Sequence, residues 1–283
     1  MNKHHQLSRK VSIGELEDYL SFKKIEGNCD RWIGDIRRWL IEYLKYIDYN
    51  ISRGKTLAFL KYKKEGYATG TYRKMIYQIR RFLLFLDVGW AKNINPPAEP
   101  EYTPKRVSKE DIQKAIEIVG HGQYGIRYIT LSLLGASSGM RAEEMYQLQP
   151  GDIDLEEQIV YINHNPKRGQ TTKTKKNRIS FFNEEAKKAL GEYLALFNKD
   201  GKLKHLFFRR QCEKVFQHTP IHVKDLRKFF SQEWDRQGGP TSIKKILMGH
   251  SLRGDVDLMH YNYQSEEDLK KIYEKVRIKI DSE

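Results

Sequence analysis

The chain has 283 residues, of which 51 are lysine or arginine and 37 are aspartate or glutamate, so its formal net charge at pH 7 is +14. This length allows two ordinary domains, and the positive charge makes nucleic acid the expected partner, with an anionic membrane surface as the alternative. No apolar run approaches the ~20 residues of a membrane helix, and MNKHHQLSRK lacks the apolar core of a signal peptide, so we expect a soluble cytoplasmic protein without a membrane partner.

The first third of the chain shows helical periodicity. In residues 71–86 (TYRKMIYQIRRFLLFL), apolar side chains recur at the i, i+3, i+4, i+7 spacing of one helical stripe, and lysine and arginine fill the opposite face. Residues 30–47 mix aromatic residues and arginines in a similar way. Such a basic face is either an ordinary solvated surface or a surface that contacts nucleic acid.

A proline-rich segment follows these helices. Four of the eight prolines fall within residues 96–104. Because proline interrupts helices and favours extended chain, this composition is typical of a linker. We therefore predict a helical domain over residues 1–94, a linker over 95–106 and a second domain over 107–283.

The second domain combines helices with a small sheet. Ser108 and Asp111 form the pattern of a capping box at a helix start. Residues 158–164 (QIVYINH) and 178–182 (RISFF) are rich in β-branched and aromatic residues and predict a hairpin with a long basic loop. Further helices are expected from residue 183 onward, over 223–237 and over 241–250. The predicted fold class is mainly α, with a small antiparallel sheet in an α+β second domain.

Several basic residues of this domain are candidates for binding an anion. Arg141 begins a helix in SSGMRAEEMYQL, whose Met145 and Leu148 are expected to face inward; a guanidinium beside free N–H groups there matches phosphate oxygens. Lys224 and Arg227 are neighbours on one helical face, and His250 ends a helix, where it caps carbonyl groups or joins a site. Exposure to solvent is the alternative explanation for Arg141, Lys224 and Arg227.

Two tyrosines, Tyr261 and Tyr263, stand just before a helix whose capping box is Ser265 and Asp268. Tyr273 lies on the apolar stripe of that helix, so we predict that it packs in the core. Taken singly, Tyr261 and Tyr263 are either packing aromatics or one of them is a nucleophile.

The sequence contains no pattern that predicts a cofactor. Cys29 and Cys212 are far apart and lack the spacing of metal ligands or of a disulfide framework. Neither a clustered Asp/Glu metal site nor a GxxxxGK[ST] phosphate loop is present.

The order of these elements resembles the catalytic domain of the tyrosine recombinases, or phage-type integrases. That domain has an arginine in a small-Gly-x-Arg-x-x-Glu helix start, a hairpin lysine, Leu-Arg on a helix, Gly-His about one helix later, and then a tyrosine. The resemblance covers roughly residues 105–280, and the first third is similar in kind to the helical core-binding domain of these enzymes. It implies a site-specific DNA recombinase that cuts and rejoins duplex DNA at attachment sites, near the nucleoid and without metal or ATP.

The resemblance also implies a role for each matching residue. Arg141 and Arg227 would clamp the scissile phosphate, and His250 would donate a further hydrogen bond to it. The hairpin lysine, a general acid, would be Lys173, six residues before Ile179, with Lys175 as second choice.

One position departs from the family pattern. Lys224 stands where the family usually has histidine. A lysine at this position resembles the integrases of archaeal viruses and plasmids, and at the ordinary pKa of a lysine its side chain would donate a hydrogen bond to phosphate and not act as a base.

The nucleophile is implied by the terminal helix. Alignment of that helix places it eight residues before Leu269, at Tyr261, with Tyr263 as second choice. It would form a 3′-phosphotyrosyl intermediate, within tetramers on DNA whose C-terminal helices are exchanged between protomers. A type IB topoisomerase-like enzyme, a catalytically silent DNA-binding protein and a basic RNA-binding module remain as alternatives.

Overall fold

The computed structural model describes residues 8–251 and 264–280, and the chain divides into two compact units, residues 1–103 and 104–283. Each unit has its own hydrophobic core. The proline-rich stretch carries no helix or strand up to Ser108, and it is attached at both ends. Arg73 holds the Pro97 carbonyl on the first side, and the Val107 amide donates to Gln232 on the second.

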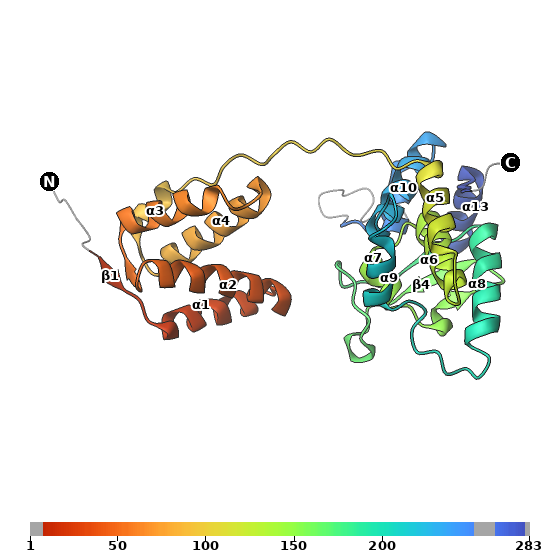
Figure 1. Ribbon diagram of the computed structural model, residues 1–283, viewed down its shortest axis with the longest axis horizontal. Coiled ribbons are helices and arrows are strands. Elements are labelled where there is room, and N and C mark those ends of the chain that lie inside the picture. The colour runs from red at the N-terminus through yellow and green to blue at the C-terminus, as the bar shows by residue number, and fades with distance from the viewer. Residues whose placement is uncertain (1–7, 252–263, 281–283) are drawn as a thin grey trace. The chain divides into compact units, whose positions relative to one another are not determined.

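The first unit is helical. α2 packs against α1, α3 and α4 in this unit, and Figure 1 shows α1 and α2 lying side by side. The apolar stripe predicted over residues 71–86 faces the core, where Met75, Ile79 and Leu83 are fully buried. Its elements are β1 (Arg9–Lys10), α1 (Ile13–Ile25), α2 (Asp30–Tyr46), β2 (Asn50–Ile51), α3 (Arg53–Lys64), α4 (Thr69–Phe85) and the 3-10 helix η1 (Gly89–Asn93).

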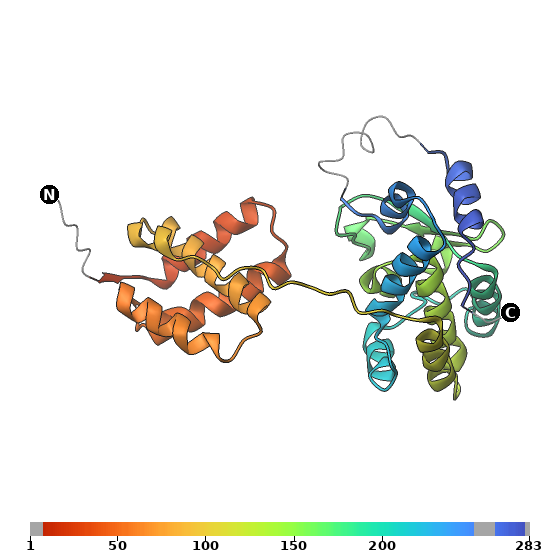
Figure 2. The ribbon, with the colours of Figure 1, turned by 90° about the horizontal axis from the view of Figure 1, so that it is seen from above.

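The second unit is built around α6 (Gly125–Ser138). Nearly every residue of α6 is buried, and α5, α7, α8 and α10 all pack against it (Figures 1 and 2). Among the described residues, the other helices of this unit are α5 (Lys109–Val119), α7 (Ala142–Tyr146), α8 (Glu184–Phe197), α9 (Arg209–Phe216), α10 (Val223–Arg236), α11 (Thr241–Met248) and α13 (Glu266–Val276), with 3-10 helices η2 (Pro150–Asp152) and η3 (Pro166–Arg168).

The predicted hairpin is present as β4 (Ile159–Ile162) and β5 (Arg178–Phe181), which pair antiparallel with Val160 opposite Ser180. A strand that the sequence did not predict, β3 (Ile153–Asp154), pairs with the other edge of β4. It escaped prediction because two residues are too few to show alternation. The fold prediction, mainly α with a small antiparallel sheet, is confirmed.

Local capping signals predicted helix starts well. Both predicted capping boxes form: the Asp111 amide donates to Ser108 Oγ at 3.2 Å, and the Asp268 amide donates to Ser265 Oγ at 3.1 Å. The helix after Arg141 is shorter than expected, because α7 ends at Tyr146 and Leu148 is buried beyond it. Among the described residues, no helix is long and apolar enough to cross a membrane.

Candidate active site

The site begins at a sharp turn between α6 and α7. Gly139 ends α6 with a φ of +64°, and an added Cβ there would lie 2.4 Å from the Phe230 ring, so only glycine fits. The turn places Arg141 at the N-cap of α7 with an extended backbone. Arg141 donates through Nη1 to Glu144 Oε1 at 2.9 Å and through Nη2 to the Gly249 carbonyl at 2.8 Å. Its guanidinium is therefore held by α7 on one side and by the end of α11 on the other.

Arg227 reaches the same place from α10. Its Nη1 group donates to the carbonyls of Gly139 and Met248, both at 2.8 Å. Burial lowers the pKa of Arg227 to about 10, and the positive charges of Arg141 and Arg178 act in the same direction. The cations are thus close enough to repel one another, an arrangement that favours binding of an anion.

His250 follows the end of α11. Gly249 terminates the helix with a φ of +64°, and the His250 amide donates to the Lys245 carbonyl at 2.9 Å. Although His250 keeps an exposed edge, partial burial and then the charges of Arg227 and Arg141 lower the pKa of its imidazole. The structure therefore brings Arg141, Arg227 and His250 together from segments that lie far apart in the sequence.

Two residues of this cluster were not among the sequence candidates. Glu144 is buried, and its carboxylate accepts from the Arg141 amide at 2.8 Å and from both Nη groups of Arg178 at 2.9 and 2.6 Å. Burial alone would raise the pKa of Glu144, but the hydrogen bonds and charges of Arg178 and Arg141 outweigh it, so the pKa is lowered. Glu144 belongs to the Arg-x-x-Glu pattern quoted above, which signalled it, whereas Arg178 opens a strand and no periodicity marked it.

The predicted lysines lie on more open surfaces. Lys173 and Lys175 are exposed in the loop between β4 and β5, and Lys224 is exposed on α10. The loop is shaped by Thr172, whose hydroxyl donates to the Lys176 carbonyl and accepts from the Lys176 amide. The lysines are therefore more exposed to solvent than the half-buried arginines.

The environment of Tyr273 differs from that expected of a nucleophile. Tyr273 is buried on α13 and donates to the Ser137 carbonyl at 2.9 Å, and its burial raises the pKa of the phenol. A buried phenol with its proton engaged is not an available nucleophile, so the packing role predicted for Tyr273 agrees with its environment. Tyr261 and Tyr263 lie outside the described residues.

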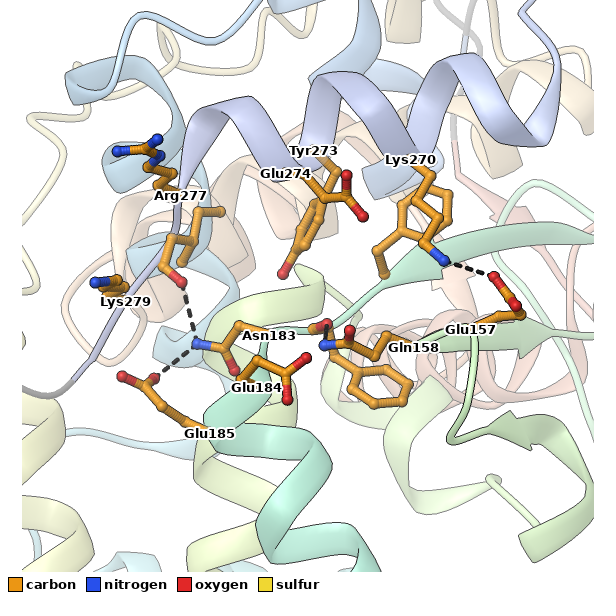
Figure 3. Close-up of a pocket in the computed structure, with 13 residues that line it drawn as sticks. Glu157, Gln158, Asn183, Glu184, Glu185, Lys270, Tyr273, Glu274, Arg277 and Lys279 are labelled. Carbon is orange, nitrogen blue, oxygen red and sulfur yellow. Dashed lines mark hydrogen bonds and ion pairs between the residues drawn. The ribbon is translucent and has the colours of Figure 1, made fainter.

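A pocket of about 310 Å³ lies away from this cluster, beneath α13 (Figure 3). Asn183 donates there to the Ile278 carbonyl and to Glu185, while Lys270 pairs with Glu157 at 2.6 Å. Because the pocket contains carboxylates that partner these donors, it is poorly suited to phosphate, and the segment after α13 forms part of its lining. Within the described residues, no group of three His, Cys, Asp or Glu side chains could hold a metal ion.

The family follows from comparison with known proteins. Residues 105–266, more than half of the chain, match the model of the phage integrase family. The chain belongs to this family and is a tyrosine-type recombinase.

The particular relatives are tyrosine recombinases from archaea and bacteria. Tyrosine recombinase XerA of Thermococcus onnurineus is 23% identical over 244 residues, 86% of this chain and 83% of the relative. Tyrosine recombinase XerD of Oceanobacillus iheyensis is 27% identical over 296 aligned positions, 92% of this chain and 96% of the relative.

Solved structures show the same fold. A lambda integrase (75–356) dimer bound to a COC′ core site matches with a TM-score of 0.64 and 10% identity, over 90% of this chain and 98% of that one. XerH recombinase bound to its difH substrate matches with a TM-score of 0.59 and 15% identity, over 92% and 83%.

Proposed function

We propose that this protein is a site-specific DNA recombinase, the integrase of an archaeal mobile element, that cuts and rejoins duplex DNA through a 3′-phosphotyrosyl intermediate. The observation that carries the proposal is the convergence of Arg141, Arg227 and His250 at the end of α11. Attack on a phosphodiester builds negative charge on its free oxygens, and fixed cations stabilise that charge without a metal ion. Two half-buried guanidiniums with depleted solvation suit this task.

In the proposed reaction, Tyr261 Oη releases its proton to solvent and attacks the scissile phosphorus, and the bond from phosphorus to the 5′ oxygen breaks. Lys173 supplies the proton that the departing 5′ oxygen takes up, with Lys175 as the alternative donor. His250 and Lys224 donate hydrogen bonds to the phosphate. A 5′-hydroxyl of a second strand then attacks the phosphotyrosine, so the phosphoester bond is retained and no ATP is required.

We further assign residues 1–94 as a core-binding domain, 95–106 as a linker and 107–283 as the catalytic domain, acting as a tetramer on paired attachment sites. The division into two units with separate cores supports this assignment. In the tetramer, α13 would leave its packing site in its own subunit and occupy the equivalent site of a neighbouring subunit. A basic net charge of +14 suits a duplex DNA partner.

The nucleophile can be tested with a nicked suicide duplex that carries the protein's binding site, selected from random-sequence DNA. Wild-type protein and Tyr263→Phe should form an adduct that resists SDS, and Tyr261→Phe should form none. Peptide mapping of the adduct identifies the linked residue directly. An adduct formed by Tyr261→Phe would show that the assignment is wrong.

The same material separates the alternatives. Relaxation of supercoiled plasmid without any sequence requirement would favour a topoisomerase-like enzyme. Tight, salt-sensitive binding without an adduct from any substrate would favour a silent DNA-binding protein. Stronger competition by RNA than by duplex DNA would favour an RNA-binding module.

A further inference from the structure

Three arginines converge on one helix end. The last carbonyls of α11 form its negative pole and lack partners within the helix, so they attract cations. Three consecutive carbonyls each accept from a different arginine: Leu247 from Arg178 Nε at 3.0 Å, Met248 from Arg227 Nη1 at 2.8 Å, and Gly249 from Arg141 Nη2 at 2.8 Å. The position of His250, the next residue, therefore depends on all three.

Arg178 differs from the other two arginines. Its side chain is 9% exposed, against 22% for Arg141, and it bonds through all three of its nitrogens inside the protein. A guanidinium has five N–H donors in a fixed plane, so this bidentate pair with Glu144 and a third bond to Leu247 determine its orientation completely. Arg178 has little capacity left for DNA.

Glu144 transmits this orientation to Arg141. The same carboxylate that Arg178 grips also accepts from the Arg141 amide and from Arg141 Nη1. Arg178 additionally shares the negative charge of Glu144, so Arg141 does not have to neutralise it alone. Three arginines and one glutamate leave a surplus of two positive charges at the place where a phosphate would bind.

The approach of Arg178 to α11 is built closely. A Cβ added at Gly249 would lie 2.8–2.9 Å from Cδ, Nε and Cζ of Arg178, and the φ of +64° also requires glycine. A larger residue at position 249 would displace either the arginine or the helix end. The contact between Arg178 and Gly249 is therefore closely packed, unlike an ion pair on an exposed surface.

We propose that Arg178 is a positioning residue of the recombination reaction: its guanidinium locks Arg141 through Glu144 and locks the α11 end that presents His250. The active site is thereby assembled before DNA binds. This inference rests on the proposed function for its catalytic consequence, but the positioning itself is a property of the free protein.

The free protein provides the first test, by NMR titration of the His250 imidazole in wild type, Arg178→Met, Arg178→Lys and the control Arg209→Met. Arg209 is an exposed arginine on α9 that pairs with Glu143 and Glu213. The cations that lower the His250 pKa are Arg227, Arg141, Lys244 and Arg178. Arg178→Met should raise this pKa and shift the amide signals of residues 247–250, while the control changes neither. Unaltered His250 titration and amide signals in a folded Arg178→Met protein would overturn the proposal.

Single-turnover adduct formation on the suicide duplex provides the second test. We expect Arg178→Met to slow adduct formation by roughly 100-fold at saturating DNA, because a misplacement of about 1 Å has an effect of this size. The DNA affinity should stay within about twofold of wild type. Arg178→Lys keeps the charge and should recover part of the rate; it also serves if Arg178→Met does not fold. Wild-type rates in both folded variants would overturn the proposal.

The two tests fail independently. If wild-type protein forms no adduct, the proposed function is wrong, and the titration still decides whether Arg178 positions His250. If adduct forms normally but Arg178→Met changes only the thermal stability, Arg178 has a structural role alone.

Discussion

Glu144 links the cationic cluster to the helical core. It is a carboxylate with a 2% exposed side chain that accepts from two arginines and a backbone amide. Buried ion pairs gain little overall, yet removal of one partner is costly because the other charge stays buried. The cluster is therefore stable only as a complete set, which explains why arginines that repel one another can be kept close together.

Glu144→Gln keeps the shape and removes the charge, so we expect a loss of about 3–5 kcal/mol in the free energy of unfolding. The folded-state pKa of Glu144 lies below its ordinary value of 4.5, so its contribution is complete above that pH and is lost as the pH falls through the folded pKa. Urea unfolding of both proteins from pH 7 down to pH 3 measures the difference, which should shrink at the acidic end. An equal difference at every pH would contradict this account.

Arg227 carries the second prediction at this scale. Its pKa, lowered to about 10, means that burial beside other cations penalises its charged form, and a bound dianion would relieve that penalty. Sulfate, standing in for the scissile phosphate, should therefore raise the thermal unfolding midpoint of the wild type. At a sulfate concentration one hundred times the dissociation constant, the free energy of unfolding should increase by about 2.7 kcal/mol. Arg227→Met should lose most of this effect.

Lys188→Met is the matched control for that measurement, because Lys188 is an exposed cation on α8 outside the cluster. It should keep the full sulfate response. A sulfate response that survives in Arg227→Met would place the anion site elsewhere.

At the scale of elements, the turn between α6 and α7 sets the geometry of the site. Gly139 allows Arg141 to leave α6 and cap α7, and its carbonyl also accepts from Arg227. The end of α11 repeats this device at Gly249. The left-handed conformations of Gly139 and Gly249 thus bring the arginines and His250 close together.

Gly139→Ala tests the turn. It combines a left-handed backbone, which costs about 1–2 kcal/mol, with a collision against Phe230 that adds about 1–3 kcal/mol. Gly169→Ala is the control, since Gly169 has a φ of +74° but no atom within 4 Å of the added Cβ. Urea unfolding should show a clearly larger loss for Gly139→Ala, and equal losses would mean that the collision is relieved without cost.

At the scale of the whole molecule, the chain contains two separate hydrophobic cores joined by a proline-rich segment. Each core is large enough for independent folding, because each draws on many buried apolar side chains. The side-chain contacts of Arg73 and Gln232 anchor the segment to its own unit at each end. Each unit should therefore unfold on its own.

Calorimetry of the full chain should show two transitions, and the fragment of residues 104–283 should reproduce one of them within about 2 °C. Limited proteolysis should cleave first within residues 98–104, where exposed backbone lies between the anchors. The anion sulfate should shift only the transition of the 104–283 fragment. A single cooperative transition in the full chain would show that the units depend on each other.

Local signals in the sequence predicted most elements. The capping boxes at Ser108 and Ser265 act through neighbours three residues away, and the β4–β5 hairpin follows from two β-branched runs. By contrast, β3 is too short for a pattern, and the end of α7 depends on tertiary packing. Patterns of period 2 or 3.6 need several residues before they can be distinguished.

The sequence by itself determined the basic character, most of the elements and the family, because charge and local periodicity are properties of neighbouring residues. Only the tertiary structure decided that Arg141 meets Gly249 across 108 positions and that Arg178 grips Glu144 across 34. Those contacts depend on how α6, α7, α11 and β5 pack. A charged side chain requires a specific partner only where packing has excluded water from it, and the sequence does not show where that happens.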